Sequence, residues 1–408
     1  MNKKFVSANT LSPKQVKSIL LQKIKDEQGK IKPDLADLNL NSKVILKPNK
    51  ANVDSLFSGA GGLDLGLELA GLDAVIGKEQ TDKVLKDKAK YDKWRCRSIF
   101  HLSYSNDNFK EADTTYRQMF GRDIVKSNKD IRKVSAFPAC QVMVGGFPCP
   151  GFSVAGPRLI DDPRNFLYVH YIRALLATQP LFFIGENVKG LLTLANGNVF
   201  KQLKEDFASS GYDVYANLVN AKNYGVPESR ERVILIGVRR DITQKYSFKY
   251  EVPNITNDGT KTPFVTLKNA LKGLPANPTD VYQSGFSSMY MSRNRKKAWD
   301  DVSFTIQASA RQIPLAPYGK PMKKVAKDKW VFQGNVNRRL SVRECARIQT
   351  FPDWFKFDDG DSGNINTRLA KQYRQIGNAV PVELARKVLR PIAEFLVTHP
   401  ELLEKGKT

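Results

Sequence analysis

The sequence predicts an α/β protein, with a Rossmann-like, mostly parallel sheet covered by helices on both faces and a smaller, irregular β-rich region. Between about residues 53 and 240, short apolar runs alternate with segments of helical periodicity. Between about 241 and 337 this alternation gives way to Pro, Gly, Asn, Thr and Ser with scattered aromatic residues. The first pattern is typical of a doubly wound sheet, and the second of loops and irregular strands.

The apolar runs give the expected strands, in chain order VDSLF (53–57), DAVIG (73–77), CQVMVGG (140–146), PLFFIGEN (180–187), YDVYANLV (212–219) and RVILIGV (232–238). Helical periodicity returns in LSVRECARIQTF and VPVELARKVLRPIAEFLVTH, after Arg339. We therefore expect four segments: a basic N-terminal extension (1–52), a main domain (53–240), a smaller domain (241–337) and a C-terminal segment that completes the main domain (338–408).

Composition limits the class of protein. The four cysteines show neither disulfide density nor C-x-x-C spacing, and only three histidines are present, so neither a disulfide framework nor a metal site is expected. The N-terminus lacks a long apolar core, and no apolar stretch reaches the 18 or so residues of a membrane span. These features favour a cytoplasmic protein with no membrane partner.

The chain is strongly basic. Lys and Arg outnumber Asp and Glu by 65 to 41, a net charge of +24, which favours a polyanionic partner over a merely soluble basic surface. The extension, which carries one short amphipathic stretch at 16–24, either adds contacts to that partner or caps the fold. A second basic concentration lies between Phe286 and Arg339. Nucleic acid is the expected partner.

A glycine-rich turn predicts a nucleotide-like cofactor. The strand that ends at Phe57 leads through Gly59, Gly61 and Gly62 into a helix, and such glycines let the backbone approach a ligand at a helix N-terminus. Glu79 is expected at the end of the next strand, where it would accept hydrogen bonds from ribose hydroxyls. The turn alone does not distinguish a dinucleotide from S-adenosylmethionine or from a purely structural turn. No G-K-[ST] follows, so ATP hydrolysis is not expected.

Cys149 is the candidate nucleophile. It lies in GGFPCPGFS directly after an expected strand, and the prolines on both sides fix the backbone around the thiol. Open α/β sheets bind ligands at this carboxyl edge. A buried structural cysteine is the alternative, but packing does not require a loop of this composition.

Charged residues close two further strands. Glu186 and Asn187 follow a buried apolar run, where a carboxylate is costly unless it is paired or functional. Arg230 and Arg232 lie two residues apart at the start of another strand and suit an anionic partner. A salt-bridged structural Glu186 is the alternative.

Taken together, six motifs resemble those of C5-cytosine DNA methyltransferases of the bacterial restriction-modification type. They occur in that family's order and cover about 53–240 and 338–389: SLFSGAGGLDLGLELAG, GGFPCPGFSVAG, GENVKGL, NYGVPESRERVILIGVR, RRLSVRECARIQTFPDWF and YRQIGNAVPVELARKV.

The resemblance implies S-adenosyl-L-methionine as cofactor. The matching positions that would bind it are Phe57, Gly59, Gly61, Gly62, Glu79, Gln80, Asp130, Ile131, Pro148, Asn378, Ala379 and Val380. Asp123 with Ile124 is a competing alignment for the Asp130–Ile131 pair. The chain departs from the family at Pro150, where Gln is commoner, and at Gln80, where an aromatic residue or Asp often stands.

The resemblance also implies the catalytic roles. The thiolate of Cys149 would add to C6 of a flipped cytosine, and Glu186 would supply or share a proton at its N3. Arg232 would interact with the cytosine O2, Asn187 would help hold the Glu186 carboxyl, and Arg230 would orient this group or meet a phosphate. Residues 241–337 would read double-stranded DNA. The expected DNA contacts are Ser153, Arg293, Arg295, Lys296, Lys297, Arg311, Lys323 and Lys324. A monomer without an obligatory protein partner is expected, and an RNA cytosine methyltransferase or a catalytically silent DNA-binding module are the alternatives.

Overall fold

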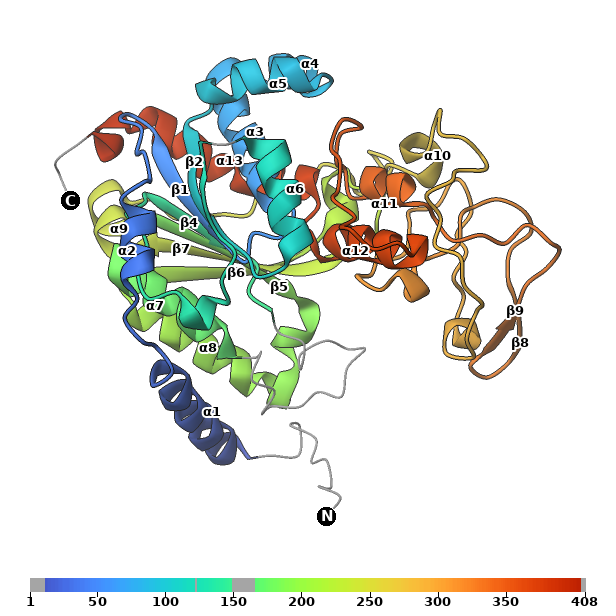
Figure 1. The fold of residues 1–408 in the computed structure, drawn as a ribbon, viewed down its shortest axis with the longest axis horizontal. Helices are drawn as coiled ribbons and strands as arrows, with labels where there is room; N and C mark the ends of the chain where they lie inside the picture. Colours follow the sequence, from blue (N-terminus) through green and yellow to red (C-terminus); the bar gives the residue numbers. More distant parts are fainter. Residues whose placement is uncertain (1–11, 122, 149–165, 405–408) are drawn as a thin grey trace.

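The computed structural model describes residues 12–121, 123–148 and 166–404. Its centre is a seven-stranded sheet in the order β3-β2-β1-β4-β5-β7-β6 (Figure 1). The strands are β1 (Ala51–Leu56), β2 (Phe100–Asn106), β3 (Val125–Ser127), β4 (Val142–Gly145), β5 (Phe182–Val188), β6 (Tyr212–Asn220) and β7 (Glu231–Arg239). Among these described strands, β7 alone runs opposite to the other six. The predicted mostly parallel α/β sheet is therefore confirmed.

Five of the six expected strands are present, and one is wrong. Residues 73–77 close helix α3 (Gly62–Ile76), and α4 (Lys78–Leu85) and α5 (Lys88–Trp94) follow it. Residues 62–72 of α3 are all buried, so apolar side chains surround this helix and its last turn resembles a buried strand in sequence. Strands β2 and β3, which follow α5 and α6 (Lys110–Phe120) respectively, were not predicted.

One face of the sheet is covered by helices from both ends of the chain. Helix α3 packs against α13 (Val382–Thr398), with α11 (Val342–Ile348) and α12 (Ile365–Asn378) beside them (Figure 1). The α3–α13 contact is tight, because a Cβ added at Gly66 would lie 2.4 Å from the Cβ of Ala385. The C-terminal segment thus shares the core of the main domain.

The opposite face carries α7 (Tyr168–Thr178) and α8 (Asn198–Ser209) over a second core rich in aromatic residues. Helices α1 (Pro13–Gln28) and α2 (Leu35–Asn41) of the N-terminal extension lie on this side (Figure 1). Four partly buried residues of the extension pack against the second core: Ile19, Ile24, Leu40 and Val44. The described part of the extension is therefore joined to the main domain by apolar contacts.

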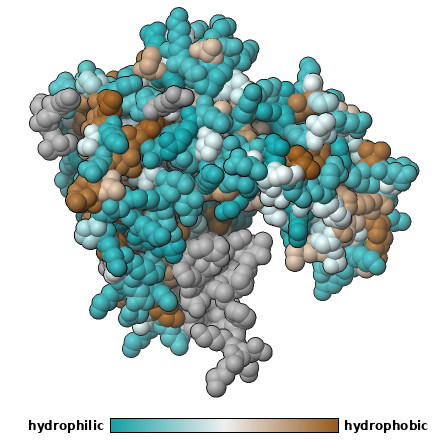
Figure 2. Space-filling view, in the orientation of Figure 1, coloured by the Kyte–Doolittle hydropathy of each residue, from teal (hydrophilic) through white to brown (hydrophobic). Residues whose placement is uncertain are grey.

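Residues 241–337 hold little regular structure. They contain α9 (which begins at Arg240 and ends at Tyr246), α10 (Leu267–Ala270) and the hairpin of β8 (Lys323–Ala326) and β9 (Lys329–Val331). Ile242 and Leu267 are buried in the first core, whereas a separate small core gathers around Tyr290. Figure 2 shows the surface hollowed between the body that holds the sheet and the lobe that holds this hairpin. No described helix is both long and apolar enough to cross a membrane.

Candidate active site

A cavity of about 530 Å³ lies at the carboxyl edge of β1, β4 and β5. Segments that are distant in sequence line it together, among them the glycine turn after β1, residues 145–148 at the end of β4, residues 186–188 at the end of β5, and residues 377–380 at the end of α12. Its size is that of an ordinary ligand site. The edge predicted for ligand binding thus carries the largest group of sequence-predicted residues.

The glycine turn has the backbone geometry of a ligand cradle. Phe57, Gly59 and Gly61 have φ of 54°, 54° and 84°, in the left-handed region, which is strained for a residue such as Phe57. Gly61 is the N-cap of α3. A Cβ added at Gly62 would lie 2.4 Å from the carbonyl oxygen of Val380, so this turn and the 377–380 loop meet at backbone distance.

The floor of the cavity holds polar atoms without internal partners. Ser55 Oγ and Asp64 Oδ2 are buried and make no hydrogen bond of ordinary geometry to a described residue, although the Ser55 hydroxyl lies close enough to lower the pKa of the Asp64 carboxyl. Asp64 Oδ1 accepts a bond of 2.9 Å from the Tyr116 hydroxyl. Burial raises the pKa of Asp64 to about 6. Buried polar groups of this kind are usually satisfied by a ligand or water.

Asp107 stands where Glu79 was expected, and the prediction for Glu79 and Gln80 is wrong. Glu79 lies in α4, its side chain is 88% exposed and pairs with Lys83, and neither it nor Gln80 lines the cavity. Asp107 directly follows β2, lines the cavity, and accepts a hydrogen bond of 2.9 Å from the Gly59 amide. Burial raises the pKa of its carboxyl.

Of the other residues expected to bind the cofactor, all but Gly61 line the cavity. Asp130 and Ile131 line one wall, whereas the competing pair Asp123 and Ile124 does not reach it. Residues 378–380 line the side formed by the glycine turn. Among the lining residues that sequence reasoning missed are Lys129, Phe109 and Arg374, whose guanidinium lies 4.2 Å from the centre of the Phe109 ring.

Glu186 and Arg232 form the charged centre of the site. Arg232 Nε lies 2.8 Å from Glu186 Oε1, and the two side chains are 12% and 11% exposed. A Cβ at Gly146 would lie 3.2 Å from Glu186 Oε2, so the absence of a side chain there leaves room for the carboxylate. Burial, together with the neighbouring Arg230 cation, lowers the pKa of Arg232 to about 10. The ion pair with Arg232 offsets the cost of burying the carboxylate that the sequence places at the end of β5.

Asn187 connects β5 with the loop that follows β4. Its Nδ2 donates to the carbonyl oxygen of Phe147 at 3.0 Å, and Pro148 lines the cavity immediately after that carbonyl. The expected nucleophile Cys149 and the expected DNA contact Ser153 lie outside the described residues. The described loop therefore leads from the Glu186 side of the cavity directly into Cys149.

Arg230 was expected either to orient the group around Arg232 or to meet a phosphate, and its contacts lie inside the protein. Its side chain is 1% exposed, and its guanidinium donates to the carbonyl oxygens of Ile306 (3.0 Å), Gly377 (2.8 Å) and Ala379 (3.0 Å), with Glu228 at 3.4 Å. These partners bind the two terminal nitrogens of the guanidinium, whereas its Nε has no hydrogen-bond partner among the described residues and Arg230 also lines the cavity. Arg230 is thus a positioning residue and is not available to a phosphate.

Two of the expected DNA contacts are also wrong. Arg295 is buried and donates to the Tyr290 carbonyl and to Gln312, and Lys296 is buried and donates to three carbonyl oxygens and to Asn337. Lys297 is partly buried, with its ammonium 4.9 Å from the Phe304 ring centre. The remaining expected contacts in this region are exposed: Arg293, Arg311, Lys323 and Lys324.

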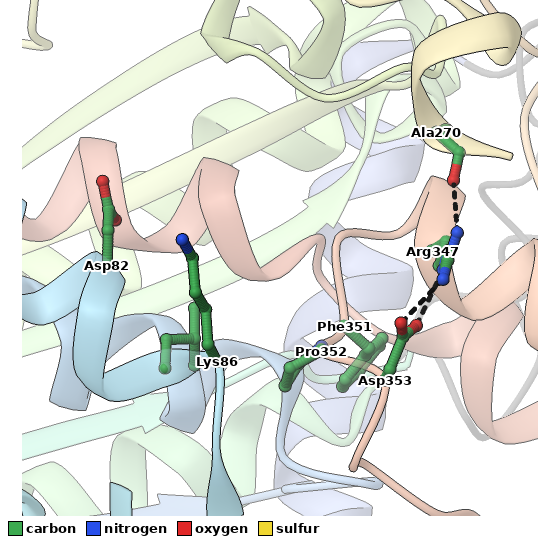
Figure 3. Close-up of a pocket in the computed structure, with 8 residues that line it drawn as sticks. Asp82, Lys86, Ala270, Arg347, Phe351, Pro352 and Asp353 are labelled. Carbon is green, nitrogen blue, oxygen red and sulfur yellow. Dashed lines mark hydrogen bonds and ion pairs between the residues drawn. The ribbon is translucent and has the colours of Figure 1, made fainter. Parts of the chain in front are cut away.

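A second cavity, of about 460 Å³, shares no lining residue with the first (Figure 3). It lies between α4 and the segment after α11, and its Arg347 is paired with Asp353 and with the carbonyl oxygen of Ala270. Among the described residues no group of three or more His, Cys, Asp or Glu could hold a metal ion. The described candidate chemistry is therefore concentrated in the first cavity.

Comparison with known proteins identifies the family. Residues 51–394 match the model of the C-5 cytosine-specific DNA methylases, a range that includes every described wall of the cavity. The chain belongs to this family. The methylase is thus a DNA (cytosine-5) methyltransferase.

Named relatives cover nearly the whole methylase. The Type II methyltransferase M.BsuRI of Bacillus subtilis is 52% identical over 99% of this chain and 93% of its own length. M.BspRI of Lysinibacillus sphaericus is 50% identical over 97% and 94%. Among solved structures, the Entamoeba histolytica methyltransferase EhMeth aligns with a TM-score of 0.57 at 17% identity, over 86% of this chain and 98% of its own. That likeness supports the fold.

Proposed function

We propose that this methylase transfers the methyl group of S-adenosylmethionine to C5 of a cytosine flipped out of duplex DNA, as the modification enzyme of a restriction-modification system. The observation that carries the proposal is the Glu186–Arg232 pair on the same cavity as the glycine turn, beside the loop that leads into Cys149. The Type II relatives support the restriction-modification role.

The residues around the cavity fit the proposed cofactor. Asp107 would accept hydrogen bonds from the ribose hydroxyls, and the buried Asp64 carboxyl suits a cationic group. The other residues that would hold the cofactor are Phe57, Gly59, Gly61, Gly62, Asp130, Ile131, Pro148, Asn378, Ala379 and Val380. When bound, S-adenosylmethionine supplies an electrophilic methyl group on its sulfonium.

The protein's part in the reaction is to make C5 nucleophilic. The thiolate of Cys149 adds to C6 of the cytosine and displaces an electron pair toward N3, where the Glu186 carboxyl supplies or shares a proton. Arg232 forms an ion pair with that carboxyl and would interact with the cytosine O2. Asn187 keeps the nucleophile loop against β5 through the Phe147 carbonyl.

After methylation the adduct must be resolved. A base, for which a water molecule suffices, removes the C5 proton; the electron pair of that bond reforms the ring double bond and expels the Cys149 thiolate. The proton at N3 returns to the Glu186 carboxylate, which leaves a neutral methylated base. Because C5 and C6 lie inside the stack of a duplex, the target nucleotide has to leave the helix. The hollow beside the lobe of β8 and β9 is the proposed entry for the duplex (Figure 2).

Residues 241–337 are the proposed recognition region, with 53–240 and 338–408 as the catalytic domain. Exposed cations of this region would contact phosphates: Arg293, Arg311, Lys323 and Lys324. A modification at a single base needs one active site, so we propose a monomer that acts on DNA in the cytoplasm.

Bisulfite sequencing of a random-sequence duplex library treated with the methylase and S-adenosylmethionine tests the proposal. The expected result is methylation at one cytosine of a short defined sequence, with no activity for Cys149→Ser. Glu186→Gln should lose about 10²-fold or more in rate, as expected for a general acid. Glu79→Gln, remote from the cavity, is the matched control. Robust transfer by Cys149→Ser, or modification of tRNA without modification of DNA, would refute the proposal.

A further inference from the structure

The N-terminal extension lies outside the range matched by the family model, which begins at residue 51. Its described part nevertheless reaches one wall of the cofactor cavity. We define this wall segment as residues 128–135, of which Lys129, Asp130, Ile131 and Arg132 line the cavity.

The wall segment has little backbone structure to fix its position. Strand β3 ends at Ser127 and β4 begins at Val142, and the only described regular element between them is a single 3₁₀ turn at Ile131–Lys133. Without ladder hydrogen bonds, side chains from elsewhere must hold such a segment. From inside the main domain, Arg173 of α7 donates to the carbonyl oxygens of Ile131 and Val134, at 3.1 and 2.5 Å.

From outside the main domain, two acidic residues of the extension bind the same wall segment. Lys129 Nζ lies 2.7 Å from Asp34 Oδ2 and 2.6 Å from Asp37 Oδ1. Asp37 Oδ2 also accepts hydrogen bonds from the amide (2.7 Å) and the hydroxyl (3.0 Å) of Ser135. The Asp37 side chain is only 2% exposed, so its charge-assisted bonds are the better shielded ones, whereas the Asp34 side chain is exposed.

The extension is itself anchored on helix α7. Glu27 of α1 is buried, pairs with Lys30, and lies 3.2 Å from Nε2 of His170 in α7. Burial lowers the pKa of His170, which the Glu27 carboxylate partly offsets. Helix α7 also carries Arg173, the inner contact of the wall. Extension, α7 and wall segment therefore form one connected set of contacts.

We propose that Asp37, aided by Asp34, is a positioning residue for the cofactor: it holds Lys129 and Ser135 so that Asp130 and Ile131 stay on the cavity wall. Loss of the acids would release the Lys129 ammonium beside Asp130, where it would compete with Arg132 for that carboxylate. The extension would then be a part of the methyl-donor site, with no contact to DNA required. This inference rests on the proposed function.

Calorimetric titration of the full-length protein with S-adenosylmethionine tests the inference. We expect Asp37→Asn to raise the Kd of the cofactor about tenfold, within the usual range of coupling between linked sites. The KM for cofactor should rise with it, while kcat and the KM for duplex DNA change by less than about twofold. Hydrogen exchange of the amides in 128–135 should be faster. Ser135→Ala removes the hydroxyl that donates to Asp37 and should shift the cofactor Kd in the same direction.

Asp26→Asn is the matched control, because Asp26 lies on the same extension, is exposed, and accepts a bond from Gln22 within α1. It should leave the cofactor Kd unchanged. If folded Asp37→Asn binds cofactor as the unmodified protein does, or if the KM values for cofactor and DNA rise together, the inference is wrong. If the unmodified protein binds no S-adenosylmethionine, the proposed function fails instead.

Discussion

Replacement of Arg230 by Met should destabilise the protein strongly, because its guanidinium is the only described cation within ion-pair distance of buried Glu228. Glu228 is fully buried, and burial raises the pKa of its carboxyl; Arg230 Nη1 lies 3.4 Å from its Oε1. Removal of one partner of such a pair typically costs about 3–5 kcal/mol, since the other charge is left uncompensated. The three carbonyl acceptors of Arg230 would also lose their donor.

Equilibrium unfolding in urea measures this loss. Arg230→Met should lower the free energy of the first unfolding transition by about 3–5 kcal/mol. If the buried charge causes most of that loss, Glu228→Gln in the same background should restore about 1–2 kcal/mol, a coupling typical of contacting residues. The control Arg390→Met removes an exposed partner of Glu394 and should cost less than about 1 kcal/mol.

Two outcomes would refute this reasoning. A cost for Arg230→Met no larger than that for Arg390→Met would mean that the buried contacts contribute nothing net to stability. A double variant less stable than Arg230→Met would mean that the Glu228 charge is satisfied without Arg230, for instance through its bond of 2.6 Å from the Ile306 amide.

Three further predictions concern cofactor, packing and pH. Asp107→Ala should weaken S-adenosylmethionine binding about tenfold or more in a calorimetric titration, since hydrogen bonds to a charged group contribute roughly 1.5–3 kcal/mol; Glu79→Ala should not, and the reverse result would restore Glu79 to the site. Gly66→Ala should cost about 1–3 kcal/mol through overpacking against Ala385, and an unchanged melting temperature would contradict the α3–α13 contact. Burial lowers the pKa of His101 from 6.5 to about 4. The free energy of unfolding is therefore at its full value above pH 6.5, where the imidazole is neutral in both states, and it falls by up to about 3 kcal/mol as the pH falls to 4. Denaturant unfolding of His101→Gln should show a correspondingly shallower pH dependence between 7 and 4, and equal slopes would contradict it.

The parts of the site that local signals encode could be predicted. Left-handed backbone at Gly59 and Gly61 favours glycine, and an apolar run that ends in Glu186 marks a buried strand with a charged end. The approach of residues 377–380 to Gly62 has no local signal, because it depends on how α13 packs on α3. Only the resemblance to a known family anticipated it.

The error at Glu79 has a topological cause. Helices α4 and α5 separate α3 from β2, so the acid after the second strand lies farther along the chain than in a compact βαβ unit. Strand β2 also lacked the signature of a buried strand, because it buries polar residues such as Ser103 and Ser105. Asp107 could have been found from the apolar alternation of Phe100, Leu102 and Tyr104.

Charge alone also misled the expectation for the DNA surface. A sequence shows that Lys296 carries a cation but not that the carbonyl oxygens of Tyr318, Lys320 and Val336 converge on it. Such acceptors come from distant turns, and a buried ammonium is tolerated only where they meet. The local excess of charge in this region therefore overstates the number of cations that face solvent.

Arg230 shows why the cofactor side and the recognition side of the molecule cannot be treated as independent. Its guanidinium holds the Ile306 carbonyl of one region and the Gly377 and Ala379 carbonyls of the other. A Cβ at Gly377 would lie 2.3 Å from the carbonyl carbon of Gln307, so the two segments are also in direct backbone contact. A displacement of residues 306–307 must therefore either carry the 377–380 loop, and with it one wall of the cofactor cavity, or break buried hydrogen bonds. Breaking the buried hydrogen bonds costs free energy, so for small movements the 377–380 loop is expected to move together with residues 306–307.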